Sequence, residues 1–573
     1  MEHSEKTKSS KISDIIVDAD SDLSALEESE DELSPQDIEA QSSDMSDDDV
    51  TSSSQTGVWR PAGRQPAADA FLGRRGPTAA AHVSNAESPL DYFLLFYPDN
   101  VLGKVVLETN RNAAQFLAAN PPTPHAISKE KRWTDVSEEE VRKFIGLIMM
   151  MGFVQKNGNL MSYWSKDERL ATPYFPAVMS RNRFQKIKRF IHFSNNDELP
   201  NNVDDKLYKI QPVCNLILER WRSMYDLGEQ ISVDEGIMKW RRRLDFRVHQ
   251  KDERKKKHDI KTYILFDAKS KYCWNIDIHH GVSKTLKETV IALLTPKCLS
   301  VWHSLYMDKV YNSVALSEFL LERKVHTVGT LRRNRGEPPE IRNPGLMQTG
   351  DVVARDNGQV LVLAWRDKQV VKAISTKHDA SVVTITRQKK RGGGETEQVR
   401  KPVCIEDYHS HMSGGDRRDE TIAYYTFTRK TMEWTKTIFF NFVELSAHNA
   451  FVLYKAKSSQ GNFDTFCKFR LELASQLCGR QGWAETSFDE CDDVKPPVPK
   501  QPRMDPADRL SGGHKRHFLA AFPQNASKKP KYKPCRVCRK HGRRMDTRYY
   551  CAHCGVALCV VPCFRDYHAK TLY

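Results

Sequence analysis

Apolar residues recur at helical intervals between about residue 90 and residue 229. The stretch "DVSEEEVRKFIGLIMMMGF" begins with Ser137 and Glu140, which have the spacing of a capping box at the start of a helix. Its apolar positions at helical spacing are Val141, Phe144, Ile145 and Ile148. A helix with one apolar face must bury that face, so this part of the chain is predicted to form a packed group of helices.

A second stretch, "MSRNRFQKIKRFIHF", has the same period and a strongly basic face. Ser180 is the predicted N-cap, and the apolar face is made by Phe184, Ile187 and Phe190. The other face carries Arg181, Arg183, Lys186, Lys188 and Arg189. Two interpretations stay open here: the basic face is solvated, as on an ordinary amphipathic helix, or it contacts phosphate groups.

From about residue 230 the spacing changes to that of strands. The predicted order is strand, strand, strand, helix, strand, helix, strand. The segments are "ISVDEG", "KTYILFDA", "YCWNIDIHHG", "LKETVIALLT", "SLYMDKVY", "SVALSEFLLERK" and "HTVGTLRR". Three meandering strands followed by alternating helix and strand is the order of the ribonuclease H-like fold, in which the first and fourth strands are neighbours.

Carboxylates fall on those two strands, Asp234 on the first and Asp308 on the fourth. Two carboxylates about 4 Å apart repel by roughly 4 kcal/mol at an effective dielectric of about 20, so a shared site predicts a divalent cation or a raised pKa. Oxygen ligands suit Mg²⁺ or Mn²⁺. A third acid is expected from "DYHSHMSGGDRRDE", which offers Asp416 and Asp419. Together these residues predict a metal-dependent catalytic site.

Four arginines follow Asp234 closely, in "SVDEGIMKWRRRLDFRV". Taken alone, such a stretch is typical of a solvated hairpin with paired charges. Beside metal-held carboxylates, however, cations would hold the phosphate backbone of a nucleic acid near the metal. Arg241, Arg243 and Arg247 alternate on one face of the predicted strand, and we prefer them to Arg242 as DNA contacts.

The charge is divided unevenly along the chain. Residues 1–50 hold 17 Asp and Glu against 3 Lys, a net of −14, which leaves +28 on the other residues because the whole chain carries +14. The acidic, Ser-rich head has too few apolar residues to fold, so residues 1–89 are predicted to be disordered. The basic remainder predicts nucleic acid as the partner, since neutralised phosphates release counterions.

Cysteines are concentrated at the C-terminal end. Seven of the 13 are scattered between Cys214 and Cys491, as expected of reduced thiols, and six lie in the last 40 residues. Two tetrahedral zinc sites need eight ligands, and the segment offers eight. They are Cys535, Cys538, His541, Cys551, Cys554, Cys559, Cys563 and His568. The division of these ligands between two structural Zn²⁺ ions stays open, and His553 is an alternative to His541.

No apolar run is long enough to span a bilayer, and "MEHSEKTKSSK" lacks the apolar segment of a signal peptide, so we expect a soluble intracellular protein without a membrane partner. A Pro-rich linker leads into a short cationic run, Lys528, Lys529, Lys531 and Lys533. Such a run is either a solvated linker or a signal read by an importin-type receptor, and we expect nuclear import through it.

Several of these motifs together resemble the piggyBac-type DNA transposases. The segments that carry the resemblance are "FIGLIMMMGF", "MSRNRFQKIKRFIHF", "DKLYKIQPV", "SVDEGIMKWRRR", "YMDKVYNSVAL", "GTLRRNRG", "KPVCIEDYHSHMSGGDRRDE" and the cysteine module. The likeness runs from about residue 90 to the C-terminus. It implies a multidomain α+β protein with a ribonuclease H-like catalytic domain inserted in a helical DNA-binding and dimerisation domain, followed by the zinc-binding domain.

The resemblance also implies the domain boundaries. After the disordered residues 1–89, the helical domain would occupy 90–229 and 427–490, the catalytic domain 230–333 and 403–426, a β-rich insertion 334–402, a basic Pro-rich linker 491–532 and the cysteine-rich zinc-binding domain 533–573.

The activity implied by the resemblance is cut-and-paste transposition by a homodimer in the nucleus. The enzyme would bind double-stranded DNA at transposon terminal repeats, cleave through hairpin intermediates and integrate at TTAA. Asp234, Asp308 and Asp416 align with the family's metal-binding triad and Asp419 with a nearby additional acid. Trp434, in "RKTMEWTK", falls where the family has a DNA-contacting tryptophan. A host-adopted copy that binds DNA or chromatin without cleaving it is the alternative.

Two positions depart from the family pattern. Lys309 follows Asp308 where the family usually has Asn, and a Lys there is expected to pair with Asp308. Asp259, in "KHDIK", stands where the family usually has Gly. The three aspartates of the triad are nevertheless all present.

Overall fold

The protein is described by a computed structural model that divides into two compact units, residues 1–486 and 487–573. Residues are described over 58–119, 133–156, 160–198, 207–238, 260–280, 284–388, 396–412, 433–457, 463–480, 517–522 and 532–570, except 64, 66, 68, 84, 464 and 544. No helix within these ranges is long and apolar enough to cross a membrane.

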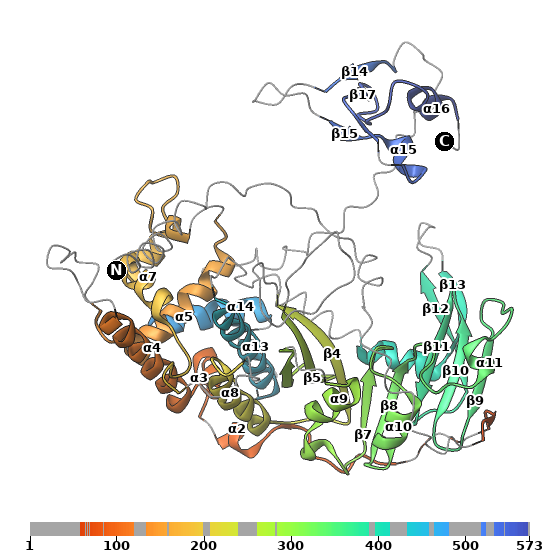
Figure 1. Cartoon of the computed structure of the whole chain (residues 1–573), viewed down its shortest axis with the longest axis horizontal. Helices are drawn as coiled ribbons and strands as arrows, with labels where there is room; N and C mark the ends of the chain where they lie inside the picture. The colour runs from red at the N-terminus through yellow and green to blue at the C-terminus, as the bar shows by residue number, and fades with distance from the viewer. Residues whose placement is uncertain are drawn as a thin grey trace, which may run out of the picture. The chain divides into compact units, whose positions relative to one another are not determined.

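A nine-stranded sheet runs from the helices of the first unit to the opposite end of that unit (Figure 1). Its order is β1-β9-β10-β11-β8-β7-β4-β5-β6. The strands are β1 (Arg60–Pro61), β9 (Val352–Asp356), β10 (Leu361–Arg366), β11 (Val370–Ser375), β8 (Val325–Thr330), β7 (His303–Met307), β4 (Gln230–Met238), β5 (Ile260–Asp267) and β6 (Cys273–Ile278). Almost every residue of β5, β7 and β10 is buried, which agrees with their runs of apolar residues.

The order of elements predicted from residue 230 onward is confirmed: β4, β5, β6, α9 (Leu286–Leu294), β7, α10 (Val314–Leu321), β8. The first and fourth strands of this series are neighbours, since β4 and β7 pair in parallel. The parallel pair β7–β8 follows, and all other pairs in the sheet are antiparallel. The parallel pairing of β4 and β7 ends at Val233 and Met307, directly before Asp234 and Asp308.

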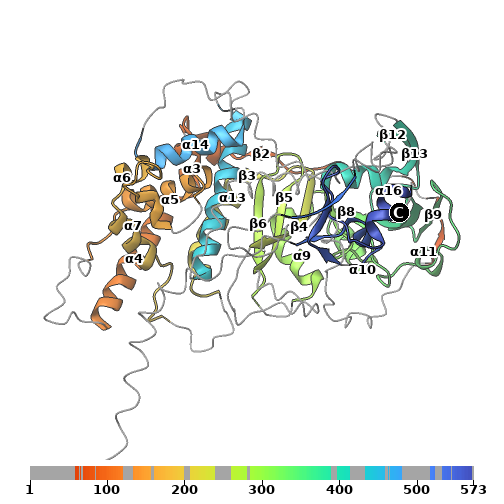
Figure 2. The same cartoon turned by 90° about the horizontal axis from the view of Figure 1, so that it is seen from above.

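Helices that precede β4 in the sequence pack with helices that follow all strands of the sheet. Together they form one group at the β6 end of the sheet (Figure 2). They are α3 (Pro89–Leu94), α4 (Asp99–Ala119), α5 (Glu138–Phe153), α6 (Tyr174–Val178), α7 (Arg181–Phe190), α8 (Gln211–Met224), α13 (Trp434–Lys457) and α14 (Phe466–Leu477). The predicted caps at Ser137, with its capping box to Glu140, and at Ser180 are confirmed. One apolar core runs from these helices into the sheet.

The predicted β-rich insertion is an extension of the central sheet, because β11 pairs with β8 through Ala373 and Thr330. Strands β9, β10 and β11 continue the sheet outward from this junction. A separate hairpin follows, made by β12 (Val382–Gln388) and β13 (Thr396–Pro402). The indole of Trp365 on β10 donates to the Arg400 carbonyl at 2.9 Å and so joins the hairpin to the sheet.

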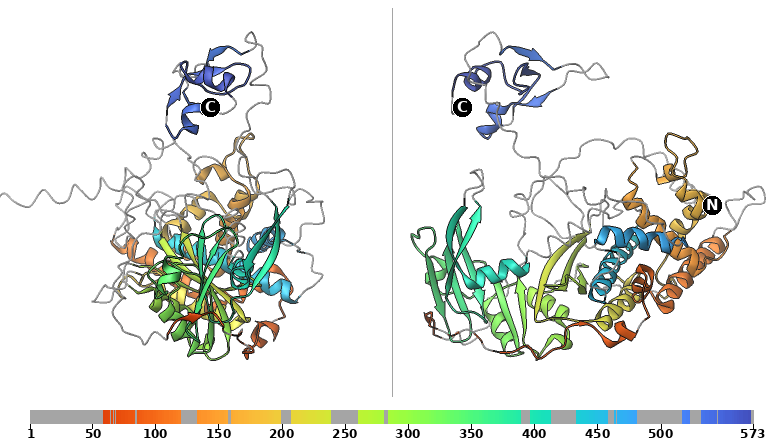
Figure 3. Two further views of the ribbon diagram at one scale, coloured as in Figure 1. Left: turned by 90° about the vertical axis from the view of Figure 1, so that its right-hand side faces the viewer. Right: turned by 180° about the vertical axis from the view of Figure 1, so that it is seen from behind.

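The described residues between 58 and 78 form an extended N-terminal strap that runs along the first unit (Figure 3). Arg60 pairs with Asp356 in the β1–β9 bridge, the Leu72 amide donates to the Val301 carbonyl at 2.9 Å, and the Thr78 amide donates to Met224. The strap includes β1 and β2 (Gly76–Pro77), and α2 (Ala79–Val83) follows it. The sequence predicts disorder up to residue 89. The structure instead shows β1, β2 and α2 before that boundary.

The C-terminal unit is small and is built from short elements. Strand β14 (Leu519–Ala521) pairs with β17 (Tyr549–Cys551), and β15 (Lys533–Pro534) pairs with β16 (Asp546–Thr547). Helices α15 (Arg536–Lys540) and α16 (Cys563–Ala569) complete it. Because β14 belongs to this unit, the predicted start of the zinc module at residue 533 is too late.

Candidate active site and zinc-binding module

Asp234 and Asp308 lie side by side where the parallel strands β4 and β7 end their pairing. The last paired residues are Val233 and Met307, and the two aspartates come directly after them. The same register continues to β8, where Met307 pairs with Gly329 and Thr330 follows. Asp234, Asp308 and Thr330 therefore form one row across three strands, with their side chains on one face.

Hydrogen bonds hold the two carboxylates. The Thr330 hydroxyl donates to Asp308 Oδ1 at 2.9 Å, and the Tyr408 hydroxyl lies 3.5 Å from the same oxygen. The backbone amide of Glu235 donates to Asp234 Oδ1 at 2.8 Å. Both carboxylates are thus oriented by groups of the protein before any substrate binds.

Two tyrosines close to both carboxylates, Tyr408 and Tyr311, have raised pKa values. Burial, followed by the negative charges of Asp308 and Asp234, raises the pKa of Tyr408. Burial also raises the pKa of Tyr311 well above its usual value, and Glu235, Asp234 and Asp308 add to the effect. Both phenols consequently stay neutral at ordinary pH. The donor set beside them consists of carboxylate and hydroxyl oxygens, which fits Mg²⁺ or Mn²⁺.

Asn312 connects the C-terminal ends of β7 and β8 by hydrogen bonds. Its buried amide group donates to the carbonyls of Met307 and Thr330, at 2.9 Å in each case. Gly329 makes this possible, because a Cβ there would lie 2.0 Å from the Met307 carbonyl oxygen and 2.4 Å from Asn312 Nδ2. Asn312 and Gly329 were not singled out in the sequence, although both lie within the motifs "YMDKVYNSVAL" and "GTLRRNRG".

Helical residues 403–412 pack on the sheet face that carries the row of aspartates. Asp407 is their anchor: it accepts from the Tyr306 hydroxyl at 2.7 Å and lies 3.2 Å from His378 Nε2 and 3.1 Å from His411 Nδ1. Burial opposes ionisation of Asp407, but hydrogen bonds from His378, His411 and Tyr306 hold its pKa well below the usual range. We call these four residues the Asp407 clamp.

The clamp sets the position of Tyr408. The imidazole of His411 stacks on the Tyr306 ring at 4.5 Å, and the Ser232 hydroxyl contacts the His411 carbonyl at 3.5 Å. Tyr408 packs against Tyr306 and Val328 in a small apolar cluster. This packing places the Tyr408 hydroxyl next to Asp308.

Several predicted site residues lie outside the described residues. These are Asp416, Asp419, Arg241, Arg243, Arg247, Arg242 and Asp259. Trp434 is described, and it is the first residue of α13, half-buried against the main core. Lys309 forms no ion pair with Asp308 among the described residues, where the recorded side-chain partners of Asp308 are Thr330 and Tyr408.

The basic face of α7 is partly used within the protein. Arg183 makes a two-pronged ion pair with Glu140, with both nitrogen–oxygen distances 2.7 Å, and lies over the ring of Trp133. Arg189 lies 4.6 Å from the ring centre of Phe116. Of the five predicted cations, Arg181 and Arg189 are exposed. The helix therefore uses Arg183 for packing, which the sequence pattern did not distinguish from phosphate contact.

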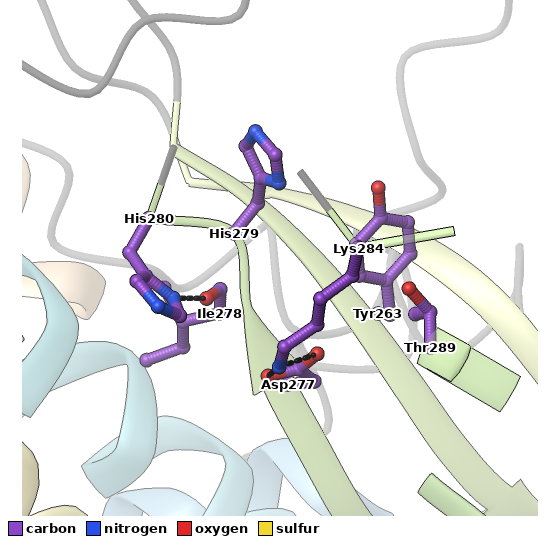
Figure 4. Close-up of a pocket in the computed structure, with 7 residues that line it drawn as sticks. All are labelled: Tyr263, Asp277, Ile278, His279, His280, Lys284 and Thr289. Carbon is purple, nitrogen blue, oxygen red and sulfur yellow. Dashed lines mark hydrogen bonds and ion pairs between the residues drawn. The ribbon is translucent and has the colours of Figure 1, made fainter. Parts of the chain in front are cut away.

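A small pocket lies on the same sheet at β5 and β6 (Figure 4). Figure 4 shows Lys284 reaching Asp277, with a nitrogen–oxygen distance of 3.0 Å, and His280 Nδ1 turned to the Ile278 carbonyl at 3.0 Å. Tyr263 lines the pocket and meets Tyr311 edge-on, with ring centres 6.1 Å apart. The Lys284–Asp277 pair of this pocket is satisfied internally, and neither Asp234 nor Asp308 lines the pocket.

Two clusters of potential zinc ligands lie in the C-terminal unit. The first contains Cys535, Cys538, Cys559 and Cys563, and the second contains His517, Cys551, Cys554 and His568. Tetrahedral zinc places two thiolate sulfurs about 3.8 Å apart, and a sulfur and a nitrogen about 3.5 Å apart. Cys538 Sγ lies 3.5 Å from Cys563 Sγ and 4.0 Å from Cys559 Sγ. The four-cysteine cluster therefore fits Zn²⁺.

The second cluster fits zinc equally well. Cys554 Sγ lies 3.4 Å from His517 Nδ1 and 3.5 Å from His568 Nε2. His568 Nδ1 faces the Phe564 carbonyl at 2.8 Å, so this nitrogen carries the proton and Nε2 is left as the ligand. Along the sequence the two ligand sets alternate, which ties distant segments of a unit that has little core of its own.

The prediction of His541 as a ligand is wrong, and the alternative His553 is not used either. His541 ends α15 with an exposed side chain, and His553 is also exposed. Their place is taken by His517, which precedes β14 and is brought to Cys551 by the β14–β17 pairing. His517 has no neighbouring cysteine in the sequence, and the only signal for it was the "HKRHF" segment upstream of the last 40 residues.

The four thiols of the four-cysteine cluster lie so close together that their ionised forms would repel one another without a cation. Burial, followed by the Cys535 and Cys538 thiols, raises the pKa of Cys559 to about 12. Burial opposes ionisation of Cys535 too, yet hydrogen bonds to it from Cys538 and Cys559 lower its pKa. Four thiolates could share this space only with a positive charge between them, and a bound Zn²⁺ would supply it.

Comparison with known proteins gives two matches to family models. The model described as "Transposase IS4" matches residues 88–451, which is more than half of the chain. The model described as "DDE_Tnp_1-like zinc finger" matches residues 515–569, a span that includes His517 and all six cysteines of the module.

Three curated human proteins are similar to this chain. PiggyBac transposable element-derived protein 2 is 22% identical over 405 residues, covering 68% of this chain and 64% of its own length. PiggyBac transposable element-derived protein 5 is 21% identical over 420 residues, covering 69% and 76%. PiggyBac transposable element-derived protein 3 is 23% identical over 505 residues, covering 84% and 76%.

Among solved structures, the cryo-EM structure of the piggyBac transposase synaptic complex with hairpin DNA is similar, with a TM-score of 0.60 and 22% identity. The similarity covers 84% of this chain and 100% of that one, so the two share a fold. With the family match across residues 88–451, the row of aspartates on parallel strands and the zinc-finger match, the chain belongs to the piggyBac-type transposases of the IS4 transposase family.

Proposed function

We propose that this protein is a metal-dependent DNA transposase that cleaves strands at the ends of a transposable element and joins them to target DNA. The proposal includes a ribonuclease H-like catalytic domain, hairpin intermediates and integration at TTAA. The observation that carries it is the single row of Asp234, Asp308 and Thr330 across β4, β7 and β8. Adjacent carboxylates at the point where two parallel strands stop pairing would form a site for a divalent cation, as strand cleavage requires.

Each residue has a proposed role. Asp234, Asp308 and Asp416 would hold Mg²⁺ or Mn²⁺, with Asp419 as a nearby additional acid. The bound ion would stabilise negative charge on the scissile phosphate and lower the pKa of the attacking hydroxyl group. The protein itself keeps the Asp234 and Asp308 carboxylates oriented through the Glu235 amide and the Thr330 hydroxyl.

The proposed contacts with double-stranded DNA come from Arg241, Arg243, Arg247 and Trp434. The similar solved structure is named as a complex with hairpin DNA, which supports DNA as the partner. Two structural Zn²⁺ ions would fold the C-terminal unit, which would add a second DNA-binding surface. We also propose that the protein acts as a homodimer in the nucleus, with import through the lysine run 528–533.

The proposal is tested with purified protein, Mg²⁺ and a duplex selected for binding from a pool in which a randomised end adjoins TTAA. We expect nicks and hairpinned ends from the wild type. Asp234→Asn and Asp308→Asn should each lower cleavage by about 1,000-fold, because a metal contributes several kcal/mol to the transition state, while duplex binding stays near normal. Asp277→Asn is the matched control, since this carboxylate lies on β6 and pairs with Lys284.

Duplex binding without cleavage would identify a DNA-binding protein instead of an enzyme. The relatives are named as transposable element-derived, so a host-adopted protein that binds DNA or chromatin is the alternative. Tight duplex binding without nicks or hairpins, at any concentration of Mg²⁺ or Mn²⁺, would contradict the transposase proposal and support this alternative.

A further inference from the structure

Two hydroxyl groups converge on one oxygen atom of Asp308. Thr330 Oγ1 lies 2.9 Å from Oδ1, and Tyr408 Oη lies 3.5 Å from it. Within the ranges that the structure describes, no protein donor is recorded for Asp308 Oδ2. An ionised carboxylate has acceptors only, so Oδ2 suits a cation or a donor that is not part of these residues.

The fold holds both hydroxyls in place. Thr330 ends β8, and its carbonyl accepts from Asn312, which also binds the Met307 carbonyl one residue before Asp308. Thr330 and Asp308 are therefore fixed to the same amide group. Tyr408 is held independently, because the Asp407 clamp ties its helical turn to Tyr306 on β7 and to His378 after β11.

We propose that Thr330 and Tyr408 are positioning residues that bind Asp308 Oδ1, prevent rotation of the carboxylate and so present Oδ2 alone to the catalytic divalent cation. This inference rests on the proposed function, since it assigns the orientation of one of the proposed metal ligands. The contact at 3.5 Å is long for a hydroxyl donor, and contacts of this kind commonly shorten when an active site is fully assembled. Thr330 is accordingly the stronger of the two donors.

Two substitutions remove the hydroxyls and keep the shapes. Thr330→Val replaces the hydroxyl by a methyl group, and Tyr408→Phe keeps the ring that packs on Tyr306 and Val328. Tyr272→Phe is the matched control, because its buried hydroxyl donates to the Trp221 carbonyl at 2.8 Å, away from the aspartates.

The measurement is the affinity of the full, zinc-loaded chain for Mn²⁺, followed by calorimetry and by water proton relaxation, together with the Mn²⁺ concentration for half-maximal cleavage. Loss of a group that orients a metal ligand typically weakens binding about 10- to 100-fold. We expect about 10-fold for Thr330→Val, less for Tyr408→Phe and up to about 100-fold for the double variant. Saturating Mn²⁺ should restore cleavage, and duplex affinity and the thermal midpoint should match the Tyr272→Phe control.

The outcomes separate this inference from the proposed function. Wild-type protein that cleaves and binds Mn²⁺, together with Thr330→Val and Tyr408→Phe proteins that bind it with unchanged affinity, would overturn the positioning role alone. Wild-type protein that neither cleaves nor binds Mn²⁺ would overturn the proposed function as well. If Tyr408→Phe unfolds, Asp407→Asn replaces it: weakening the clamp should also weaken Mn²⁺ binding, and an unchanged affinity would count against the role of Tyr408.

Discussion

Arg470 on α14 and Glu444 on α13 form a fully buried, two-pronged ion pair, with nitrogen–oxygen distances of 2.7 and 3.0 Å. A third nitrogen of the same guanidinium donates to the Met149 carbonyl on α5 at 3.1 Å. One side chain thus joins the late helices of the sequence to an early one. A buried charge without its partner is costly, so this pair holds the two parts of the helical core together.

The first prediction concerns this ion pair. Arg470→Ala should lower the free energy of unfolding by about 3–5 kcal/mol, because it leaves the Glu444 carboxylate buried and unpaired. The matched control is Lys143→Ala, which removes a solvent-exposed pair with Glu139 and should change the free energy of unfolding far less. Denaturant unfolding of both proteins checks the difference. Similar losses in the two variants would contradict the structural role assigned to Arg470.

A second prediction concerns the close approach at Gly329. Gly329→Ala should disrupt the β7–β8 junction, because the new Cβ would lie 2.0 Å from the Met307 carbonyl oxygen. We expect a loss of stability of several kcal/mol and loss of cleavage. Gly103→Ala on α4 is the control, where the nearest atom is Glu138 Oε1 at 3.4 Å and removing a mid-helix glycine should stabilise the protein by about 1 kcal/mol. Thermal unfolding and a cleavage assay report both effects.

The zinc ligands give a third prediction. His517→Ala should reduce the bound zinc from two ions to one per chain, whereas His541→Ala should leave both, since His541 belongs to neither cluster. Metal analysis after gel filtration measures the difference. A variant that loses one ion should also bind a long duplex more weakly and with a shallower salt dependence, because one basic surface is no longer folded. If the His517→Ala variant still binds two zinc ions per chain, His541 or His553 is the fourth ligand of the second site instead of His517.

A fourth prediction concerns pH and the N-terminal strap. His303 packs on Phe71 of the strap with ring centres 4.9 Å apart, and burial lowers its pKa, although hydrogen bonds to the carbonyls of Gly228 and Glu229 oppose the shift. The folded protein therefore favours neutral His303, while the unfolded chain titrates near pH 6.5. The stabilising effect is complete above about pH 6.5 and is lost as the pH falls below it.

Hydrogen exchange at the Leu72 amide, which donates to the Val301 carbonyl, measures this effect locally. Exchange, corrected for its intrinsic pH dependence, should accelerate between pH 7.5 and 5.5 in the wild type. The His303→Gln variant cannot titrate and should show a flatter profile. An equally steep profile in the variant would assign the pH dependence to another histidine, such as the half-buried His192, whose pKa is also lowered by burial.

The elements that could be predicted from the sequence are those governed by local periodicity and caps. Ser137 and Ser180 cap helices as expected, and the order of strands brings Asp234 beside Asp308. The contacts that escaped prediction join residues far apart in the sequence without a periodic pattern. Asp407 meets His378 and Tyr306, and His517 reaches Cys551, only because the fold brings their segments together.

The strap was missed for a related reason. It has few apolar residues, and its order comes from single contacts at wide intervals, such as the Gly63 amide on Asp356 and Asp69 on His326. Composition alone assigned this stretch to the acidic, disordered head. For residues 1–57, which lie outside the described residues, disorder stays a prediction.

The β1–β9 bridge has a practical consequence for making shorter forms of this protein. A fragment that starts at residue 90, the boundary suggested by composition, would lack Arg60 and Trp59 and would leave β9 as an open edge strand. Open edges with unpaired backbone groups recruit strands from other molecules, so such a fragment should self-associate in solution. A fragment that begins at Val58 keeps the β1 pairing with Arg355 and Asp356 and should remain dispersed.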